Sequence, residues 1–140
     1  METYFEFYEF IKSDVAEKNK VDNIPTFAVI ENIKLMLPLL NELRKEWGSA
    51  ITVSSGFRCD KLNKLVGGVD TSLHKKGLAV DIIPKNGEID KFIEFCKNFF
   101  KNRFDYDQVI IEKSGNTKWV HIGIYDNRGV QRHQLFNIDK

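Results

Sequence analysis

The sequence predicts a single α+β domain in which N-terminal helices pack on a small, mainly antiparallel sheet. Helical periodicity dominates the first half of the chain, whereas short β-branched runs gather in the second half. The chain has 140 residues, 42% of them hydrophobic, which suits one domain with a sizeable core. No linker, low-complexity tract or internal repeat interrupts it, so we expect the domain to span residues 1–140.

The longest helix is expected over residues 26–47, where apolar side chains recur at three- and four-residue spacings until Gly48. Pro38 falls inside this stretch and should kink the helix or divide it in two. A second helix is predicted over residues 89–100, because its apolar side chains share one face. Weaker helical patterns cover residues 4–18 and 60–65, and the turn-forming residues 19–25 end the first of them.

Four short strands are expected, at residues 50–54, 78–83, 107–112 and 118–125. The run 78–83 is almost continuously apolar and is typical of a buried strand, although it carries Asp81. The last two strands should form a hairpin, because Ser114, Gly115 and Asn116 between them favour a turn. The predicted sheet therefore lies mostly in the second half of the chain.

Composition and charge exclude several function classes. The chain has 21 basic and 20 acidic residues without a run of either sign, so nothing favours binding to nucleic acid or to a membrane surface. Its N-terminus is acidic and aromatic, unlike a Sec signal, and no apolar run is long enough to span a membrane. We therefore expect synthesis in the cytoplasm without a signal peptide. Cys59 and Cys96 belong to no CxxC motif and are expected to be reduced thiols.

Three residues with metal-binding side chains lie in the second half of the chain. His74 is expected in a loop, Gly77 lets the chain turn tightly, Asp81 follows on a strand, and His121 lies on a later strand. A charged aspartate in an apolar strand is costly to bury unless a metal, an arginine or backbone donors compensate it. Each residue alone is more often simply packed or solvated. Two histidines and a carboxylate are nevertheless a known ligand set for catalytic zinc, with a fourth position left for water.

Longer motifs surround these residues. They are SSGFRC at 54–59, LNKLVGG at 62–68, SLHKKGLAVD at 72–81 and WVH at 119–121. In this order they closely resemble the zinc D-alanyl-D-alanine carboxypeptidase family, which includes phage endolysin peptidases and the D,D-dipeptidases of glycopeptide resistance. The resemblance extends upstream through residues 13–16 and 22–25 and so covers nearly the whole chain.

The resemblance implies a Hedgehog/DD-peptidase-like fold and a zinc ion bound by His74, Asp81 and His121. It also implies that Arg58 stabilises substrate charge near the scissile carbonyl and that Ser72 helps to hold the peptide. These roles suit the side chains, since a guanidinium meets a carboxylate or an oxyanion with a rigid fork. The position of Cys59, next to Arg58, is not a metal ligand in the family.

One position departs from the family pattern. Members commonly carry an acidic residue three positions before the last zinc histidine, as the catalytic base, and Lys118 occupies that position here. The nearest substitute is Glu112. If a hairpin pairs Glu112 with Trp119, then Glu112 becomes a diagonal neighbour of His121, roughly 7–8 Å away between Cα atoms. Gln108 would share that face and is a candidate for substrate binding. A solvated strand end is the alternative interpretation of Glu112.

The first hypothesis is therefore a zinc metallopeptidase that hydrolyses peptidoglycan stem peptides, as a D,D-carboxypeptidase or as an endolysin-type endopeptidase. The second is a non-catalytic wall-binding or phage structural module on the same fold, which Lys118 favours. A third is a cytosolic dipeptidase acting on D-Ala-D-Ala. A peptidoglycan peptide is the expected partner and a monomer the expected state. The lack of a signal peptide suits a phage-encoded protein delivered to the cell wall. His133, in a polar C-terminal tail, is not expected to join the site.

Overall fold

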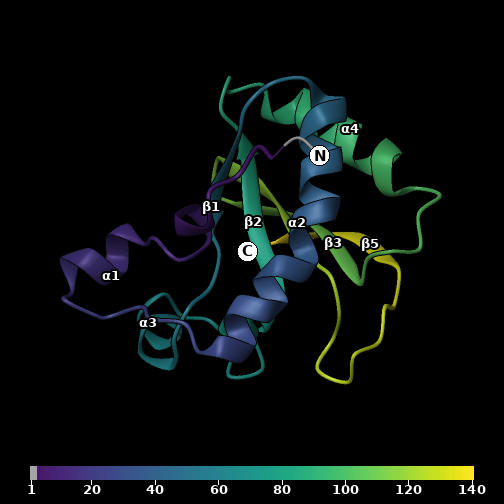
Figure 1. Cartoon of the computed structure of the whole chain (residues 1–140). Helices are drawn as coiled ribbons and strands as arrows, with labels where there is room; N and C mark the ends of the chain where they lie inside the picture. The colour runs from purple at the N-terminus through teal and green to yellow at the C-terminus, as the bar shows by residue number, and fades with distance from the viewer. Residues whose placement is uncertain (1–2) are drawn as a thin grey trace.

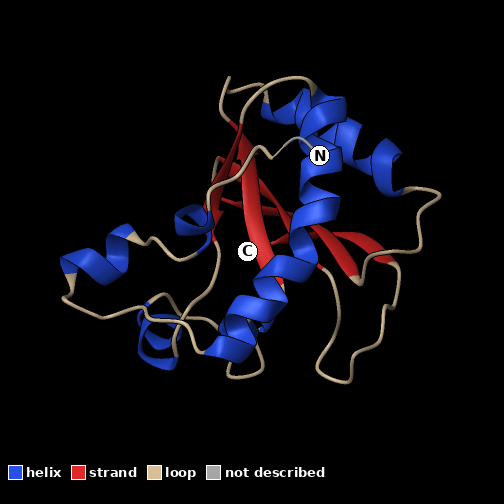
Figure 2. Ribbon diagram, in the orientation of Figure 1, coloured by secondary structure: helices blue, strands red, loops and turns tan. Residues whose placement is uncertain are grey.

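A five-stranded sheet forms the centre of the molecule (Figures 1 and 2). The computed structural model describes residues 3–140. The strands are β1 (Ile51–Ser55), β2 (Ala79–Pro84), β3 (Gln108–Ser114), β4 (Thr117–Gly123) and β5 (Gln134–Asp139). Their order is β1-β2-β4-β3-β5, with β5 parallel to β3 and every other neighbouring pair antiparallel. The predicted α+β class and the mainly antiparallel sheet are thus confirmed.

Within residues 3–140, four α-helices and two 3₁₀ turns complete the fold. They are η1 (Phe7–Phe10), α1 (Asp14–Lys18), α2 (Phe27–Trp47), α3 (Asp60–Leu65), η2 (Leu73–Lys76) and α4 (Ile89–Phe100). The helices predicted at residues 60–65 and 89–100 are present with those bounds. The pattern over residues 4–18 forms η1 and the short α1 instead of one helix, because its apolar spacing is too irregular to bury a single face.

The long helix α2 is continuous (Figure 1), although Pro38 lies inside it. Of the two expected effects of Pro38, a kink or a division into two helices, the division is therefore wrong. A proline removes one backbone hydrogen bond, but Met36 and Leu39 on either side of it are at most 5% exposed and anchor both halves to the core. The helix ends at Gly48, which has the left-handed φ of 80° that favours glycine.

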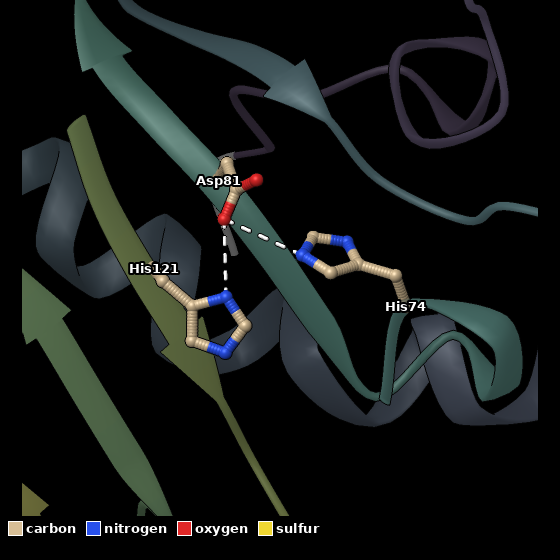
Figure 3. Close-up of side chains that lie close together, drawn as sticks. All are labelled: His74, Asp81 and His121. Carbon is tan, nitrogen blue, oxygen red and sulfur yellow. Dashed lines mark hydrogen bonds and ion pairs between the residues drawn. The ribbon is translucent and has the colours of Figure 1, made fainter. Parts of the chain in front are cut away.

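The sheet has one face for the core and one for the candidate site. Side chains that alternate along the central strands are buried in the core, where α2 and α4 cover them, and they include Val80, Ile82, Val109, Val120 and Ile122. Intervening residues such as Asp81 and His121 therefore lie on the opposite face. Figure 3 shows these two side chains on the sheet, with helices behind the strands. The strand alternation thus separates the packing surface from the polar surface.

Strand β5 was not expected from the sequence. Residues 134–139 are mostly exposed and form the edge of the sheet, so little apolar alternation marks them. His133 precedes this strand, with Nε2 2.8 Å from the carbonyl oxygen of Phe104. It does not line the cavity described below. None of the helices in the described part of the chain has the length and hydropathy needed to cross a membrane.

Both cysteines are free thiols, as expected. Cys96 is fully buried on α4, and burial raises the pKa of its thiol, whereas Cys59 is half-buried. We expect a thiol reagent to modify Cys59 readily in the folded protein and Cys96 only after denaturation. Titration with a chromogenic disulfide, before and after denaturation and without reductant, measures this. A denatured sample with no reactive thiol would contradict it.

Candidate metal and catalytic site

His74 is placed by a short, tightly constrained segment. The Ser72 side chain accepts a hydrogen bond from the His74 amide at the start of η2, and Gly77 ends η2 with a φ of 72°. A Cβ at Gly77 would press on the backbone and side chain of Val29 in α2, so glycine is required there for two reasons. The imidazole is buried, with 3% exposure, and its Nδ1 lies 2.8 Å from the carbonyl oxygen of Gly56.

Asp81 and His121 face each other across neighbouring strands. They are directly paired in the register of β2 and β4, so their side chains emerge together on the polar face of the sheet. Asp81 Oδ1 lies 3.1 Å from His121 Nδ1 and 3.4 Å from His74 Nε2 (Figure 3). One donor atom from each of the three residues lies within 4.8 Å of the others. The three candidate ligands, far apart in the sequence, thus converge on one point.

The hydrogen-bond geometry of the His74 ring fits a cation beside Asp81. A carbonyl oxygen can only accept, so Nδ1 of His74 carries the hydrogen that is donated to Gly56. In the neutral imidazole, Nε2 then presents a lone pair toward Asp81 Oδ1, which is also an acceptor. Two such atoms 3.4 Å apart repel each other unless a proton or a metal ion lies between them. A backbone carbonyl on the remote nitrogen is also the usual support of a metal-binding histidine.

The charge of Asp81 agrees with this interpretation. Burial is the largest single influence and raises the pKa of Asp81, but His74 and His121 together outweigh it and hold the pKa below the usual range. Asp81 is therefore a carboxylate at neutral pH, which is the form that binds metal.

Arg58 lies on the loop between β1 and α3, beside the three residues. Its Nη2 donates to Ser72 Oγ at 3.2 Å. Burial lowers the pKa of Arg58, and the nearby negative charges of Asp81 and Glu112 oppose this shift. An arginine remains charged under such a shift because its ordinary pKa is above 12. Arg58 and Ser72, which the resemblance named for the substrate, thus contact each other and line the same cavity as the candidate metal ligands.

Glu112 lies on the site face of the sheet, in the register that the hairpin argument gave. The structure pairs Glu112 with Trp119 and Ile110 with His121, so this register is confirmed. The side chain of Glu112 is 8% exposed, with Oε2 3.4 Å from Lys140 Nζ, so Glu112 is not a solvated strand end. Lys140 also lies near the Trp119 ring, 5.8 Å from its centroid.

Comparison with known protein families agrees with this geometry. The sequence model described as Peptidase M15 matches residues 3–123. The chain belongs to the Peptidase M15 family. A peptide is accordingly its substrate class. The comparison with curated proteins gives no match. The matched region ends at the last residue of β4 and includes every site residue predicted from the sequence, whereas β5 and Lys140 follow it.

Lys118 of this M15 peptidase points away from the site. Its Nζ forms an ion pair with Asp90 of α4 at 2.8 Å, on the helix-covered face of the sheet. Strand alternation explains the placement, since Lys118 is an odd number of residues from His121. The residue type at this position therefore has no direct influence on the polar face.

The predicted site residues line one cavity of about 1070 Å³ on the polar face of the sheet. It is lined by the three candidate ligands and by Arg58, Ser72, Gln108 and Glu112. Gln108 Nε2 donates to the Gln134 side chain at 2.7 Å, so β5 helps to hold it.

Sequence reasoning missed one wall of the cavity. This wall includes Arg128 and Arg132, which come from the loop between β4 and β5. Arg132 forms a two-point ion pair with the fully buried Asp107, and Arg128 forms one with Asp126. The first pair joins residues that are 25 apart in the sequence, and no spacing indicates it. The second pair is local, since its residues lie two apart in one loop.

Proposed function

We propose that this M15 peptidase is a zinc enzyme that hydrolyses peptide bonds in the stem peptides of bacterial peptidoglycan. The observation that carries the proposal is the convergence of His74, Asp81 and His121 in one cavity, beside the buried carboxylate of Glu112 and the half-buried side chain of Arg58. Family membership supports the peptidase activity, and the donor set supports the metal.

The metal would be held by Nε2 of His74, a carboxylate oxygen of Asp81 and Nδ1 of His121. Two imidazoles and one carboxylate leave a fourth position open, as in catalytic zinc sites. When bound, zinc supplies Lewis acidity that polarises the scissile carbonyl and lowers the pKa of water. The carbonyl of Gly56 keeps His74 in the tautomer that presents Nε2.

Glu112 is the proposed general base. Its carboxylate would take a proton from the attacking water and return it to the leaving amine. It lies diagonally from His121 across the β3–β4 pair, which separates the two Cα atoms by roughly 7–8 Å and brings the side chains within reach of one water. The ion pair from Lys140 to Oε2 leaves Oε1 for this task.

Arg58 would stabilise the negative charge that develops on the scissile carbonyl, or a carboxylate of the peptide. Arg58 lines the cavity, so its guanidinium can present N–H donors to such a charge. Ser72 and Gln108 line the same cavity and are the proposed contacts to the peptide backbone. Ser72 also caps η2, so it combines binding with support of His74.

Mass spectrometry of digested peptidoglycan tests this function. We expect the wild-type protein with zinc to release new peptide termini, and the His121→Ala variant to release none. Loss of a terminal D-Ala would identify a carboxypeptidase, whereas cleavage within a cross-link or stem would identify an endopeptidase. Hydrolysis of free D-Ala-D-Ala alone would favour the cytosolic dipeptidase. A phage-encoded enzyme delivered to the wall is our proposed setting for either wall activity.

A non-catalytic wall-binding module is the second candidate, and Lys118 is the residue that favours it. In the structure Lys118 contacts α4 rather than the cavity, so its replacement of an acidic residue leaves the polar face intact. Binding to purified wall without any new terminus in the digest would support the module instead of the enzyme.

A further inference from the structure

Asn23 lies outside the cavity, yet its side chain forms hydrogen bonds to the backbone of both residues that flank Arg58. Its Nδ2 donates to the carbonyl oxygen of Phe57 at 2.9 Å, and its Oδ1 accepts from the amide of Cys59 at 2.8 Å. Phe57 and Cys59 are the immediate neighbours of Arg58. A third bond runs from Nδ2 to the carbonyl oxygen of Ile11 at 2.8 Å. One amide side chain therefore ties the backbone around Arg58 to the N-terminal segment.

Phe10 fixes the same stretch from the N-terminal segment. The amide of Phe57 donates to the carbonyl oxygen of Phe10 at 2.6 Å. A Cβ at Gly56 would overlap the backbone of Phe10, which shows how closely the two segments approach. The amide of Arg58 itself donates to the carbonyl oxygen of His74 at 3.0 Å. The backbone around Arg58 is thus held by hydrogen bonds to the N-terminal segment and to His74.

The Arg58 side chain is held much less firmly than its backbone. It has one hydrogen bond, from Nη2 to Ser72 Oγ, and its buried Nε has no partner within residues 3–140. The direction of the guanidinium therefore depends on where the backbone places the Cα–Cβ bond. A small rotation of that bond moves the end of so long a side chain by a much larger distance.

We propose that Asn23 is a positioning residue for Arg58, acting through the peptide groups of Phe57 and Cys59. The catalytic consequence rests on the proposed function, since it assumes that Arg58 stabilises charge during hydrolysis. A misplacement of about 1 Å in an active site costs on the order of 10²-fold in rate. The N-terminal segment thereby contributes to the site without any residue in the cavity.

A double-mutant cycle on wall-peptide cleavage tests the proposal. Asn23→Ala should lower kcat by about 10- to 100-fold with a smaller change in KM. The double variant Asn23→Ala with Arg58→Ala should be no slower than Arg58→Ala alone. A further loss in the double variant would show that Asn23 acts through another residue and would overturn the proposal.

Asn41→Ala is the matched control. Asn41 Oδ1 accepts from the amide of Tyr4 at 3.1 Å, so it also secures the N-terminal segment but lies away from Arg58. We expect it to lower the Tm while kcat stays near the wild-type value, and an equal loss of kcat would overturn the proposal. Asn23→Asp keeps the size and the acceptor but removes the donors to Ile11 and Phe57. The Asn23→Asp variant should lower kcat in the same way, and it replaces Asn23→Ala in the test if that variant does not fold.

A readout without activity separates this proposal from the proposed function. The Nε–H of Arg58 gives an NMR resonance that Arg58→Lys identifies by its loss. In Asn23→Ala its hydrogen exchange should be faster by about tenfold or more, because the local structure opens more often. Unchanged exchange would overturn the positioning role. Faster exchange in a protein without wall activity would overturn the proposed function and leave the positioning role intact.

Discussion

Replacing Glu112 with glutamine is expected to lower wall-peptide cleavage by about 10²–10⁴-fold, the usual loss when a general base is removed. Glutamine keeps the shape and the hydrogen-bonding reach of glutamate but cannot take a proton from water. Metal content should remain unchanged, because Glu112 is not among the three candidate ligands. Initial rates on purified peptidoglycan, with zinc measured on the same samples, provide the test.

The matched control for this prediction is Lys118→Ala. Lys118 lies on the neighbouring strand but faces α4, where its ion pair with Asp90 contributes less than about 1 kcal/mol as a surface pair. Its removal should leave the cleavage rate near the wild-type value. Full activity in Glu112→Gln would place the base elsewhere. A large loss in Lys118→Ala would contradict the strand orientation.

The hairpin shows why part of the site could be predicted from sequence. Side chains alternate along a strand, so the parity of Glu112 relative to His121 followed once the turn at residues 114–116 was located. The same parity places Lys118 on the other face. The set of His74, Asp81 and His121 came from the family resemblance of the motifs rather than from their spacing, and the structure brings the three side chains together.

Other parts of the structure depend on contacts that the sequence does not reveal. Strand β5 is an exposed edge strand, and its pairing with β3 is set by tertiary position rather than by its own pattern. The continuity of α2 through Pro38 depends on burial against the core, which a local rule for proline does not include. Arg132 contacts Asp107 across a separation of 25 residues, so only the folded chain brings them together.

Gly56 illustrates how such contacts support the chemistry. Its carbonyl orients His74, and the absence of a side chain lets Phe10 approach the same residue. The Ser-Gly-Phe-Arg motif is therefore partly a motif for packing, in which the glycine places a histidine from another segment. A resemblance identified the motif, but its physical basis becomes visible only when the N-terminal segment lies against β1.

The wild-type protein is expected to bind about one zinc ion per chain, and His74→Ala is expected to lose it. In His74→Ala the remaining ligands are Asp81 and His121, and two protein ligands are fewer than catalytic zinc sites use. Zinc that binds the folded chain alone should also stabilise it, by about 4 kcal/mol when its free concentration is 1,000 times the Kd. Removing the metal with a chelator should therefore lower the wild-type Tm and leave that of His74→Ala unchanged.

Elemental analysis of protein purified without added zinc, together with thermal unfolding, measures both effects. His133→Ala is the matched control, because this histidine contacts Phe104 outside the cavity and should not influence the metal. Equal zinc in the wild type and in His74→Ala would refute the ligand assignment. A wild-type Tm that does not respond to chelation would show that a proton, and not a metal ion, lies between His74 Nε2 and Asp81 Oδ1.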